Sequence, residues 1–273
     1  MDLGKMTINI LKLLLILYAS SCLLLYFFQN YLFFFPRSTP TANRDRLKDA
    51  AITIKSGGLK LRGWLNAKEN PQAPLIIYYG GNAEEVSHTV LASDQLKKAS
   101  VLAINYRGYG DSEGKPSIPL LVQDAIEIFN QMVDKKGIAP NNIILMGRSL
   151  GSGIAVQVAG RRQVMAVILI TPFDSLEHIA KHHYPIFPVR LLLRHKLDSL
   201  ALAAKIDRPV LVLMAENDQI APDRYSRNLI KNWLGLVTEF TIPATDHNNI
   251  SDTQEYWRRI DDFIGKQIRQ RSM

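Results

Sequence analysis

The segment from Asn142 to Gly153 constrains the fold of this chain more than any other. Its apolar residues 143–146 predict a short buried strand, and the small residues after them predict the start of a helix. Between the two stands the pentapeptide Gly147-Arg148-Ser149-Leu150-Gly151. A serine on such a tight strand-to-helix turn has a strained backbone that exposes its Oγ, and flanking glycines avoid collisions with the neighbouring strand and helix. Ser149 is therefore a candidate nucleophile, and the alternative is an ordinary helix N-cap serine.

Short apolar runs alternate with helical patterns along most of the chain. The segment 51–67 predicts a hairpin that turns at Ser56-Gly57-Gly58. Strands that are apolar on both faces and alternate with helices predict an α/β fold with a doubly wound, mostly parallel sheet. Only the segment 173–207 breaks this rhythm, and we expect it to form short helices that cap the sheet. The other predicted strands are 74–79, 101–106, 143–146, 166–170, 210–214 and 238–242, and the predicted helices are 83–98, 118–133, 151–160, 222–233 and 254–269.

The first 35 residues predict a membrane anchor. Residues 13–28 carry no charge, Lys12 is placed to snorkel, and aromatic residues follow where the membrane interface would lie. A cleaved secretory signal and a lipoprotein signal at Cys22 are alternatives, but the small residues 19–21 lie in the middle of the apolar run instead of at its end. An uncleaved anchor is therefore favoured. The polar segment 36–49 is expected to be a linker, and 50–273 one large α/β domain.

Charge and cysteine content restrict the partners of the chain. The net charge of +8 is concentrated at 181–196 and 258–271, without the interleaved aromatic residues of a nucleic-acid surface. Anionic lipid head groups are a better partner for this charge, and a solvated basic surface is the alternative. The single cysteine excludes an intramolecular disulfide. Basic residues on either side of the anchor favour a cytoplasmic catalytic domain and leave the side of the membrane open. No obligate protein partner is indicated.

A nucleophilic serine needs a general base, and the base needs an orienting acid. In doubly wound hydrolases the chain order is serine, acid, histidine, with the last two on loops after late strands. Asp218 follows the predicted strand 210–214, and His247 follows the predicted strand 238–242. Glu216 and Asp246 are rival acids, but Asp246 is adjacent to the histidine and Glu216 is closer to its strand. Asp218 is therefore the preferred acid and His247 the preferred base.

A metal site is the competing interpretation of the histidines in the cap. Asp174, His178 and His182 are spaced four apart and would share one face of a helix. The histidine pair lacks the glutamate found between the ligands of a catalytic zinc helix, and Lys181 between them would repel a cation. The polar face of a cap helix explains the same spacing. We therefore expect no metal and no cofactor.

Acyl transfer places negative charge on the former carbonyl oxygen, which preorganised N–H groups must stabilise. The backbone N–H of Leu150, at the start of the predicted helix, is one expected donor. The second is expected in the loop Gly80-Gly81-Asn82-Ala83, where two glycines let the backbone approach a substrate and Asn82 N–H is the favoured group. The alternative is a simple strand-to-helix turn.

These motifs give the chain a resemblance to a known family. From about Phe33 to its C-terminus it resembles the small, N-terminally membrane-anchored serine hydrolases of the α/β-hydrolase superfamily, which are grouped with prolyl-oligopeptidase-like and α/β-hydrolase-domain proteins. The resemblance implies that Ser149 is the nucleophile, Asp218 the orienting acid and His247 the general base. Gly80 stands where the family commonly has the histidine of His-Gly-Asn-Ala, which puts the rigidity of that loop in doubt. The matching segments are 79–83, 105–112, 147–151, 171–175, 215–218 and 246–248.

The sequence thus predicts a membrane-anchored serine hydrolase that cleaves an ester or thioester bond through an acyl-enzyme. A small-molecule or lipid-like acyl substrate fits the anchor and the apolar residues 184–193 of the cap, which we expect to form a lid. A serine peptidase or amidase with the same triad is the enzymatic alternative. A non-catalytic membrane scaffold is the alternative from another class. Haloalkane and epoxide hydrolases share the fold, but their nucleophile is a carboxylate.

Overall fold

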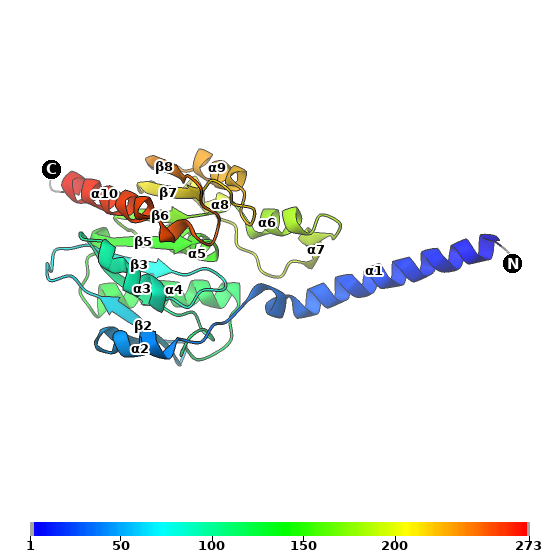
Figure 1. The fold of residues 1–273 in the computed structure, drawn as a ribbon, viewed down its shortest axis with the longest axis horizontal. Helices are drawn as coiled ribbons and strands as arrows, with labels where there is room; N and C mark the ends of the chain where they lie inside the picture. Colours follow the sequence, from blue (N-terminus) through cyan, green and yellow to red (C-terminus); the bar gives the residue numbers. More distant parts are fainter. Residues whose placement is uncertain (1–2, 272–273) are drawn as a thin grey trace.

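An eight-stranded sheet forms the centre of the computed structural model, which describes residues 3–271. The strand order is β1-β2-β4-β3-β5-β6-β7-β8, with β2 antiparallel to both neighbours and all later pairs parallel (Figure 1). This confirms the predicted mostly parallel α/β sheet. The strands are β1 (Ala51–Ser56), β2 (Leu59–Asn66), β3 (Leu75–Tyr79), β4 (Ser100–Ile104), β5 (Ile143–Arg148), β6 (Ala166–Ile170), β7 (Val210–Ala215) and β8 (Val237–Ile242).

Helices cover both faces of the sheet because its central strands are apolar on both sides. All five residues of β3 are buried, and they alternate between the two hydrophobic clusters. Ile77 and Tyr79 pack in the cluster with α4 (Ile118–Asp134), α5 (Leu150–Ala159), α8 (Leu200–Ala203) and α9 (Asp223–Lys231). Ile76 and Tyr78 pack in the cluster with α3 (Ser87–Ala92) and α10 (Gln254–Arg271). The sheet is therefore the middle layer of three.

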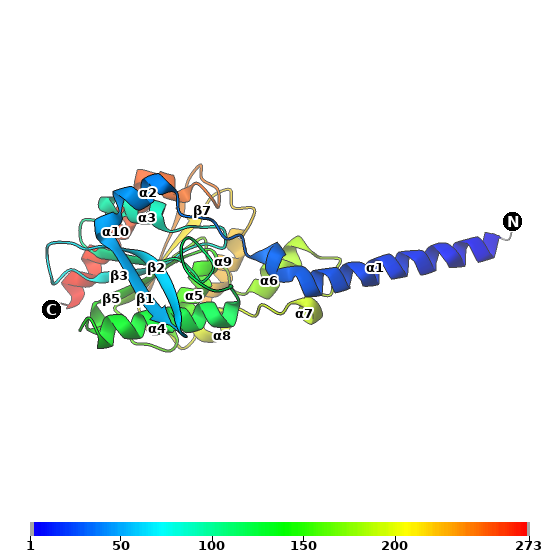
Figure 2. The same ribbon diagram turned by 90° about the horizontal axis from the view of Figure 1, so that it is seen from below.

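Two segments differ from the sequence-based expectations. The helix expected over 83–98 is only α3, followed by a short 3-10 turn, because Glu84 accepts a hydrogen bond from Gly81 N and Glu85 accepts one from the side chain of Asn105. The segment 36–49, expected as a linker, contains α2 (Thr41–Arg46), whose buried Asn43 donates to Ser87 Oγ at 2.8 Å. Figure 2 shows α2 beside α3 on the surface of the domain. This segment is thus packed onto the domain.

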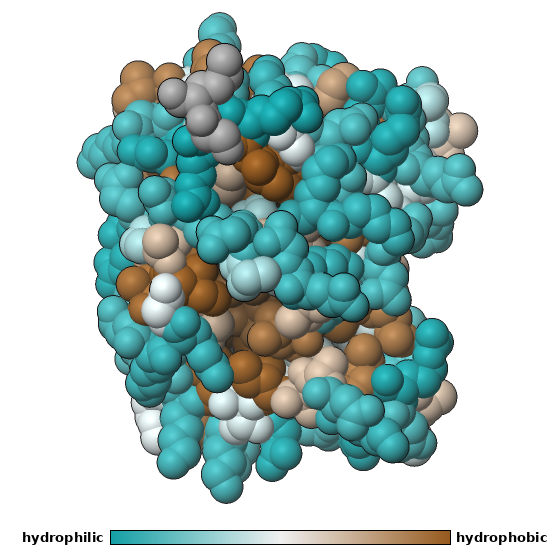
Figure 3. All heavy atoms as spheres, turned by 90° about the vertical axis from the view of Figure 1, so that its left-hand side faces the viewer, coloured by the Kyte–Doolittle hydropathy of each residue, from teal (hydrophilic) through white to brown (hydrophobic). Residues whose placement is uncertain are grey.

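The N-terminal helix α1 (Leu3–Phe33) projects away from the domain (Figures 1 and 2). It has the length and the apolar composition to cross a membrane, and its most apolar window is not buried by the rest of the chain. Its C-terminal end, in contrast, docks onto the domain: Gln29 is largely buried, and Phe34, the residue after the helix, is buried in the main core. Viewed from the end opposite α1, the domain surface is mainly hydrophilic, with apolar residues toward the middle (Figure 3). Within residues 3–271, most of the exposed large apolar side chains lie on α1.

The predicted cap lies between the sheet and α1. It consists of α6 (Leu176–His183), α7 (Val189–Leu192) and α8, joined by irregular chain. The hydroxyl of Ser175 accepts a hydrogen bond from His178 N, which caps the N-terminus of α6. In Figure 1, α6 and α7 lie on the side of the domain from which α1 projects. Short helices, as expected for 173–207, thus connect the apolar helix with the edge of the sheet.

Candidate active site

The turn between β5 and α5 holds Ser149 in a strained conformation. Its φ is 51° and its ψ is −116°, a region that non-glycine residues rarely adopt. A Cβ on Gly147 would lie 2.1 Å from the carbonyl oxygen of Gly151, and a Cβ on Gly151 would lie 2.0 Å from the carbonyl oxygen of Tyr79. The two glycines are therefore required by the close approach of helix and strands, as the sequence suggested.

Three side chains that are far apart in the sequence meet at this turn. His247 Nε2 lies 2.9 Å from Ser149 Oγ, and His247 Nδ1 lies 2.8 Å from Asp218 Oδ2. The other carboxylate oxygen of Asp218 accepts hydrogen bonds from the backbone N–H groups of Ile220 and Ala221. His247 is 6% exposed. The geometry allows the imidazole to take a proton from the serine hydroxyl while the carboxylate fixes its orientation.

The two rival acids bond elsewhere. Glu216 accepts a hydrogen bond from Ala244 N at 2.8 Å, and Asp246 accepts from the backbone N–H groups of Asn248 and Asn249. These N–H groups lower the pKa of Asp246 from its usual value. Both carboxylates therefore stabilise the loops around His247, and Asp218 is the acid that contacts the imidazole.

The loop after β3 is held by the C-terminal end of α1. The side-chain amide of Asn82 donates to Phe33 O at 3.0 Å, and Asn82 O accepts from Phe35 N and from the Tyr109 hydroxyl. Tyr106 also donates to Gly80 O at 2.8 Å. These bonds use the carbonyl and side chain of Asn82 and none of them uses its backbone N–H. Leu150 is the first residue of α5, so its N–H lacks an intrahelical partner.

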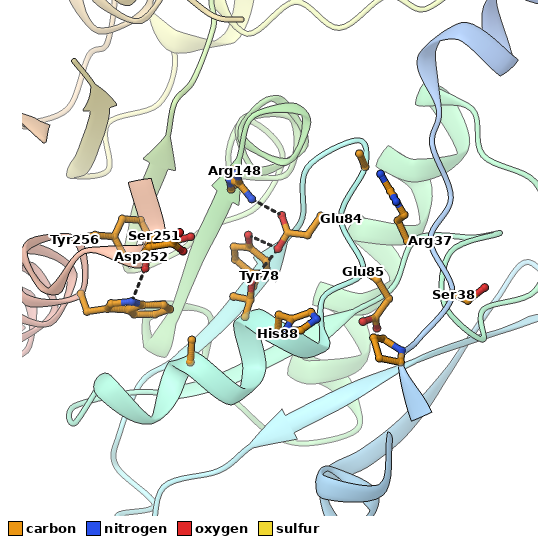
Figure 4. Close-up of a pocket in the computed structure, with 15 residues that line it drawn as sticks. Arg37, Ser38, Tyr78, Glu84, Glu85, His88, Arg148, Ser251, Asp252 and Tyr256 are labelled. Carbon is orange, nitrogen blue, oxygen red and sulfur yellow. Dashed lines mark hydrogen bonds and ion pairs between the residues drawn. The ribbon is translucent and has the colours of Figure 1, made fainter. Parts of the chain in front are cut away.

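A polar network of Tyr78, Glu84 and Arg148 lies beside the serine turn, and Figure 4 shows these three side chains pointing toward one another. Arg148 donates to the carbonyl oxygens of His247 and Asn248, and its Nη1 lies 3.5 Å from Glu84 Oε2. Glu84 also accepts from the Tyr78 hydroxyl and from Gly81 N, each at 2.8 Å. Glu84 and Arg148 thus tie together the loop after β3, the serine turn and the histidine loop.

The ionisation of this network follows from its burial. Burial, and next the Glu84 carboxylate, raise the pKa of the Tyr78 phenol well above its ordinary value, so the phenol stays protonated and donates. Burial alone would lower the pKa of Arg148, but Glu84, Tyr78 and Tyr256 together outweigh it and the pKa is raised. The guanidinium is therefore charged. A cavity of about 640 Å³ lies beside the network, and Ser149, Asp218 and His247 are not among its lining residues.

The sequence did not indicate the Glu84–Arg148 pair. Each residue has only a weak signal of its own: Arg148 is the variable residue before the serine, and Glu84 follows the loop 80–83. The available signal was that Glu84 and Arg148 carry opposite charges and belong to two motifs that must meet at the same edge of the sheet. In the structure, Glu84 accepts a hydrogen bond from Gly81 N and so holds the loop in which Gly80 replaces the histidine common in the family.

Replacing Glu84 by alanine should lower the free energy of unfolding by about 3 kcal/mol, because it leaves the Arg148 charge largely buried and unpaired. The side chains of Glu84 and Arg148 are 13% and 17% exposed, so solvent screens the pair little. Thermal unfolding of the full-length protein in detergent measures the change. Glu69→Ala, at an exposed position of the loop before β3, is the matched control and should change it little. Equal stability of the two variants would contradict a structural role for the pair.

The histidines of α6 have protein partners. Asp174 Oδ2 lies 2.8 Å from His178 Nδ1 and also accepts from the side chain of Asn228. His182 Nδ1 lies 2.8 Å from Arg224 Nη2, a cation that opposes metal binding. Within residues 3–271, no group of three or more histidine, cysteine or acidic side chains is arranged to hold a metal ion.

Comparisons with known proteins agree with this fold. The family model described as serine aminopeptidase, S33, matches residues 70–194. An uncharacterized protein of Mycobacterium tuberculosis is 30% identical over 227 residues, 81% of each chain, and an uncharacterized membrane protein of Saccharomyces cerevisiae is 28% identical over 77% of each. The solved structure of a Pyrococcus furiosus esterase superposes with a TM-score of 0.67 at 15% identity, covering 86% of this chain and 96% of its own.

The strand order, the strained serine turn and these matches define the class of protein. The chain belongs to the α/β-hydrolase superfamily, as its motifs suggested, and it is a hydrolase.

Proposed function

We propose that this protein is a membrane-anchored serine hydrolase that cleaves an ester or thioester bond. The observation that carries the proposal is the hydrogen-bonded array of Ser149, His247 and Asp218 on a strained strand-to-helix turn. A positive φ at Ser149 lowers the stability of the fold, and strained residues of this kind are concentrated at functional sites. An array of three such groups is the arrangement that converts a serine hydroxyl into a nucleophile near neutral pH.

In the proposed reaction, Ser149 Oγ attacks the carbonyl carbon while His247 Nε2 takes the hydroxyl proton. The tetrahedral intermediate then collapses, the C–O or C–S bond breaks, and the imidazolium gives its proton to the departing alcohol or thiol. Water attacks the acyl-serine with His247 again acting as base, and the acid product leaves. The Asp218 carboxylate keeps Nδ1 protonated and stabilises the imidazolium that forms twice in each turnover.

The charge on the substrate oxygen needs donors, and Leu150 and Asn82 are the proposed ones. The N–H of Leu150 adjoins the nucleophile at the start of α5, where the helix dipole favours an anion. The loop of Asn82 is fixed by hydrogen bonds to Phe33, Phe35 and Tyr109, which supports a preorganised backbone N–H.

Membrane anchoring by α1 is part of the proposal. The helix has 31 residues, more than the roughly 20 needed to cross the hydrocarbon core of a bilayer. A relative described as a membrane protein supports this assignment. A substrate with an acyl chain suits an enzyme whose cap lies against such a helix.

A serine peptidase is the second candidate, and the matching family model, described as serine aminopeptidase, favours it. The two candidates differ in the bond cleaved and share the same triad. Hydrolysis of p-nitrophenyl esters of graded chain length, compared with aminoacyl p-nitroanilides, separates them. Turnover of the anilides at rates equal to the esters would favour the peptidase.

A fluorophosphonate probe tests the nucleophile directly, because it phosphonylates an activated serine and needs no knowledge of the substrate. The wild-type protein should be labelled, and Ser149→Ala should lose the label completely. Ser152→Ala is the matched control: Ser152 lies on α5 three residues away, and its hydroxyl donates to Ser149 O instead of contacting His247. Absence of labelling in the folded wild type would favour the non-catalytic scaffold.

A further inference from the structure

An apolar groove lies between the C-terminal half of α1 and the cap. It has a volume of about 130 Å³, and apolar side chains make up most of its walls. In both ribbon views α7 lies near α1, and the two helices are in contact (Figures 1 and 2). The groove is distinct from the triad, whose residues do not line it. Its walls include Leu25, Leu32 and Phe33 of α1 and Phe187, Leu192 and His195 of the cap.

Specific polar contacts fix the two walls relative to each other. The side chain of Gln29 donates to Leu192 O at 3.2 Å and accepts from Arg194 N at 2.8 Å. Farther along α1, the Tyr18 hydroxyl donates to Ile186 O at 2.9 Å. These bonds use polar groups of both walls, so the surface left facing the groove is mainly hydrocarbon.

His195 is the exception on that surface. It is 5% exposed, and its Nε2 has no hydrogen-bond partner within residues 3–271. The ring packs against Phe33 and Phe34, with centroid distances of 5.4 and 5.1 Å. Burial, and next the charge of Arg194, lower the pKa of His195, so the imidazole is neutral at neutral pH. A buried nitrogen without a partner is unfavourable, and a ligand with one polar atom at this place would satisfy it.

The position of the groove along α1 indicates the source of the ligand. A helix of 31 residues is about 46 Å long, whereas the hydrocarbon core of a bilayer is about 30 Å thick. If the helix crosses the bilayer, the stretch that lines the groove, 25–33, lies near the boundary between hydrocarbon and head groups. The tip of the cap exposes Tyr184, Ile186 and Leu191 beside it. Exposed apolar residues at this level would insert among lipids.

The charged residues around the groove are those expected of a lipid-binding site. Arg190, Arg194 and Lys196 are exposed around the cap end of the groove, and Arg194 lies over the ring of Tyr26, 5.5 Å from its centroid. Basic groups at the head-group level attract anionic lipids. A cavity of this size resembles the engineered apolar cavity of about 150 Å³ that binds benzene, so it accepts a few methylene groups and no helix. An extended peptide would also bring backbone groups that the apolar walls leave unpaired.

We propose that this groove binds one acyl chain of a bilayer lipid, with a carbonyl or hydroxyl oxygen of that lipid hydrogen-bonded to His195 Nε2. The inference rests on the membrane anchoring in the proposed function, but it does not require Ser149 to be a nucleophile. The bilayer supplies the ligand at the level where the groove opens, and α1 forms one wall of the site.

Photo-crosslinking of the full-length protein tests this site. The protein is inserted into vesicles of phosphatidylcholine containing one quarter phosphatidylglycerol, with a trace of phosphatidylcholine whose acyl chain carries a diazirine. Flotation of the vesicles establishes insertion, and peptide mapping after irradiation locates the label. We expect the label to concentrate in peptides covering 25–33 and 184–195. Failure to float, or label spread evenly along α1, would overturn the proposal.

Two substitutions in the cap refine the test. Leu192→Trp fills the groove and should lower labelling of these peptides about tenfold, a typical cost of overpacking. Glu177→Trp adds comparable bulk to α6 at a side chain that is exposed and outside the groove, and should leave the label unchanged. Equal labelling of the two variants would contradict the site. Thermal unfolding establishes whether the two tryptophan variants are folded. If one of them is not, the positions of the crosslinked peptides in the wild type still decide the test.

His195→Phe tests the polar contact. The ring stacking with Phe33 and Phe34 is retained, but the hydrogen bond to the lipid oxygen is lost, so labelling should fall about two- to tenfold. Unchanged labelling would overturn the contact with Nε2. Ser149→Ala should be labelled like the wild type. If the fluorophosphonate probe fails on the wild type while the groove is labelled, the proposed hydrolase activity alone is wrong.

Discussion

His247→Ala should lower the turnover number for p-nitrophenyl butyrate by about 10⁶, because in Ser–His–Asp hydrolases loss of the base costs nearly as much as loss of the whole triad. His247 Nε2 contacts Ser149 Oγ, and no other nitrogen base contacts that hydroxyl in the part of the chain that the structure describes. Without the imidazole, the hydroxyl keeps its proton and the leaving group receives none. Steady-state turnover and fluorophosphonate labelling should both fall toward background.

The cap provides a matched control for this substitution. His178 is also paired with an aspartate, Asp174, at 2.8 Å, but it lies on α6 and does not contact Ser149. Because no proton has to pass through it, His178→Ala should retain most of the activity. A His247→Ala enzyme that stays within tenfold of the wild type would refute the assigned base. Comparable losses in the two variants would indicate a general effect on folding.

The second largest effect is expected for the orienting acid. Asp218→Asn should lower the turnover number by about 10⁴, because the amide favours the wrong imidazole tautomer while preserving the shape of the site. The side chain of Asp218 is 3% exposed, and its two oxygens are bonded to His247 Nδ1 and to the N–H groups of Ile220 and Ala221. Asparagine offers an oxygen to only one of these partners. The effect of Asp218→Asn on stability is therefore measured separately by thermal unfolding.

Substitutions of two neighbouring acids, Glu216 and Asp246, show whether Asp218 acts by orienting the His247 imidazole or only by its negative charge. Glu216→Gln and Asp246→Asn also remove one negative charge near His247, but these carboxylates accept from backbone N–H groups and do not contact the imidazole. Each should lower the turnover number by less than about tenfold, as expected of charges that act only through solvent-screened fields. If either variant matched Asp218→Asn, the acid would have been assigned wrongly.

Local patterns in the sequence predicted the sheet well. The strands 210–214 and 166–170 were recognisable because buried parallel strands are short, continuous apolar runs. The helix expected over 83–98 is limited to Ser87–Ala92. Residues 83–86 are not helical, and there the carboxylates of Glu84 and Glu85 accept hydrogen bonds from Tyr78 and Asn105. The segment 36–49 also has a tertiary contact that its sequence does not indicate, since Asn43 has its partner on α3.

The sequence by itself determined the strand–serine–helix turn, the chain order of serine, acid and histidine, and the apolar helix at the N-terminus. These features are contained in neighbouring residues, because a tight turn, a strand or a long apolar helix is set by local sterics and periodicity. Only the tertiary structure decided that Glu84 meets Arg148, that the end of α1 holds Asn82, and that His195 lies unpaired in a groove. Each of these contacts joins segments tens of residues apart, and no sequence pattern specifies which side chains meet when the chain folds.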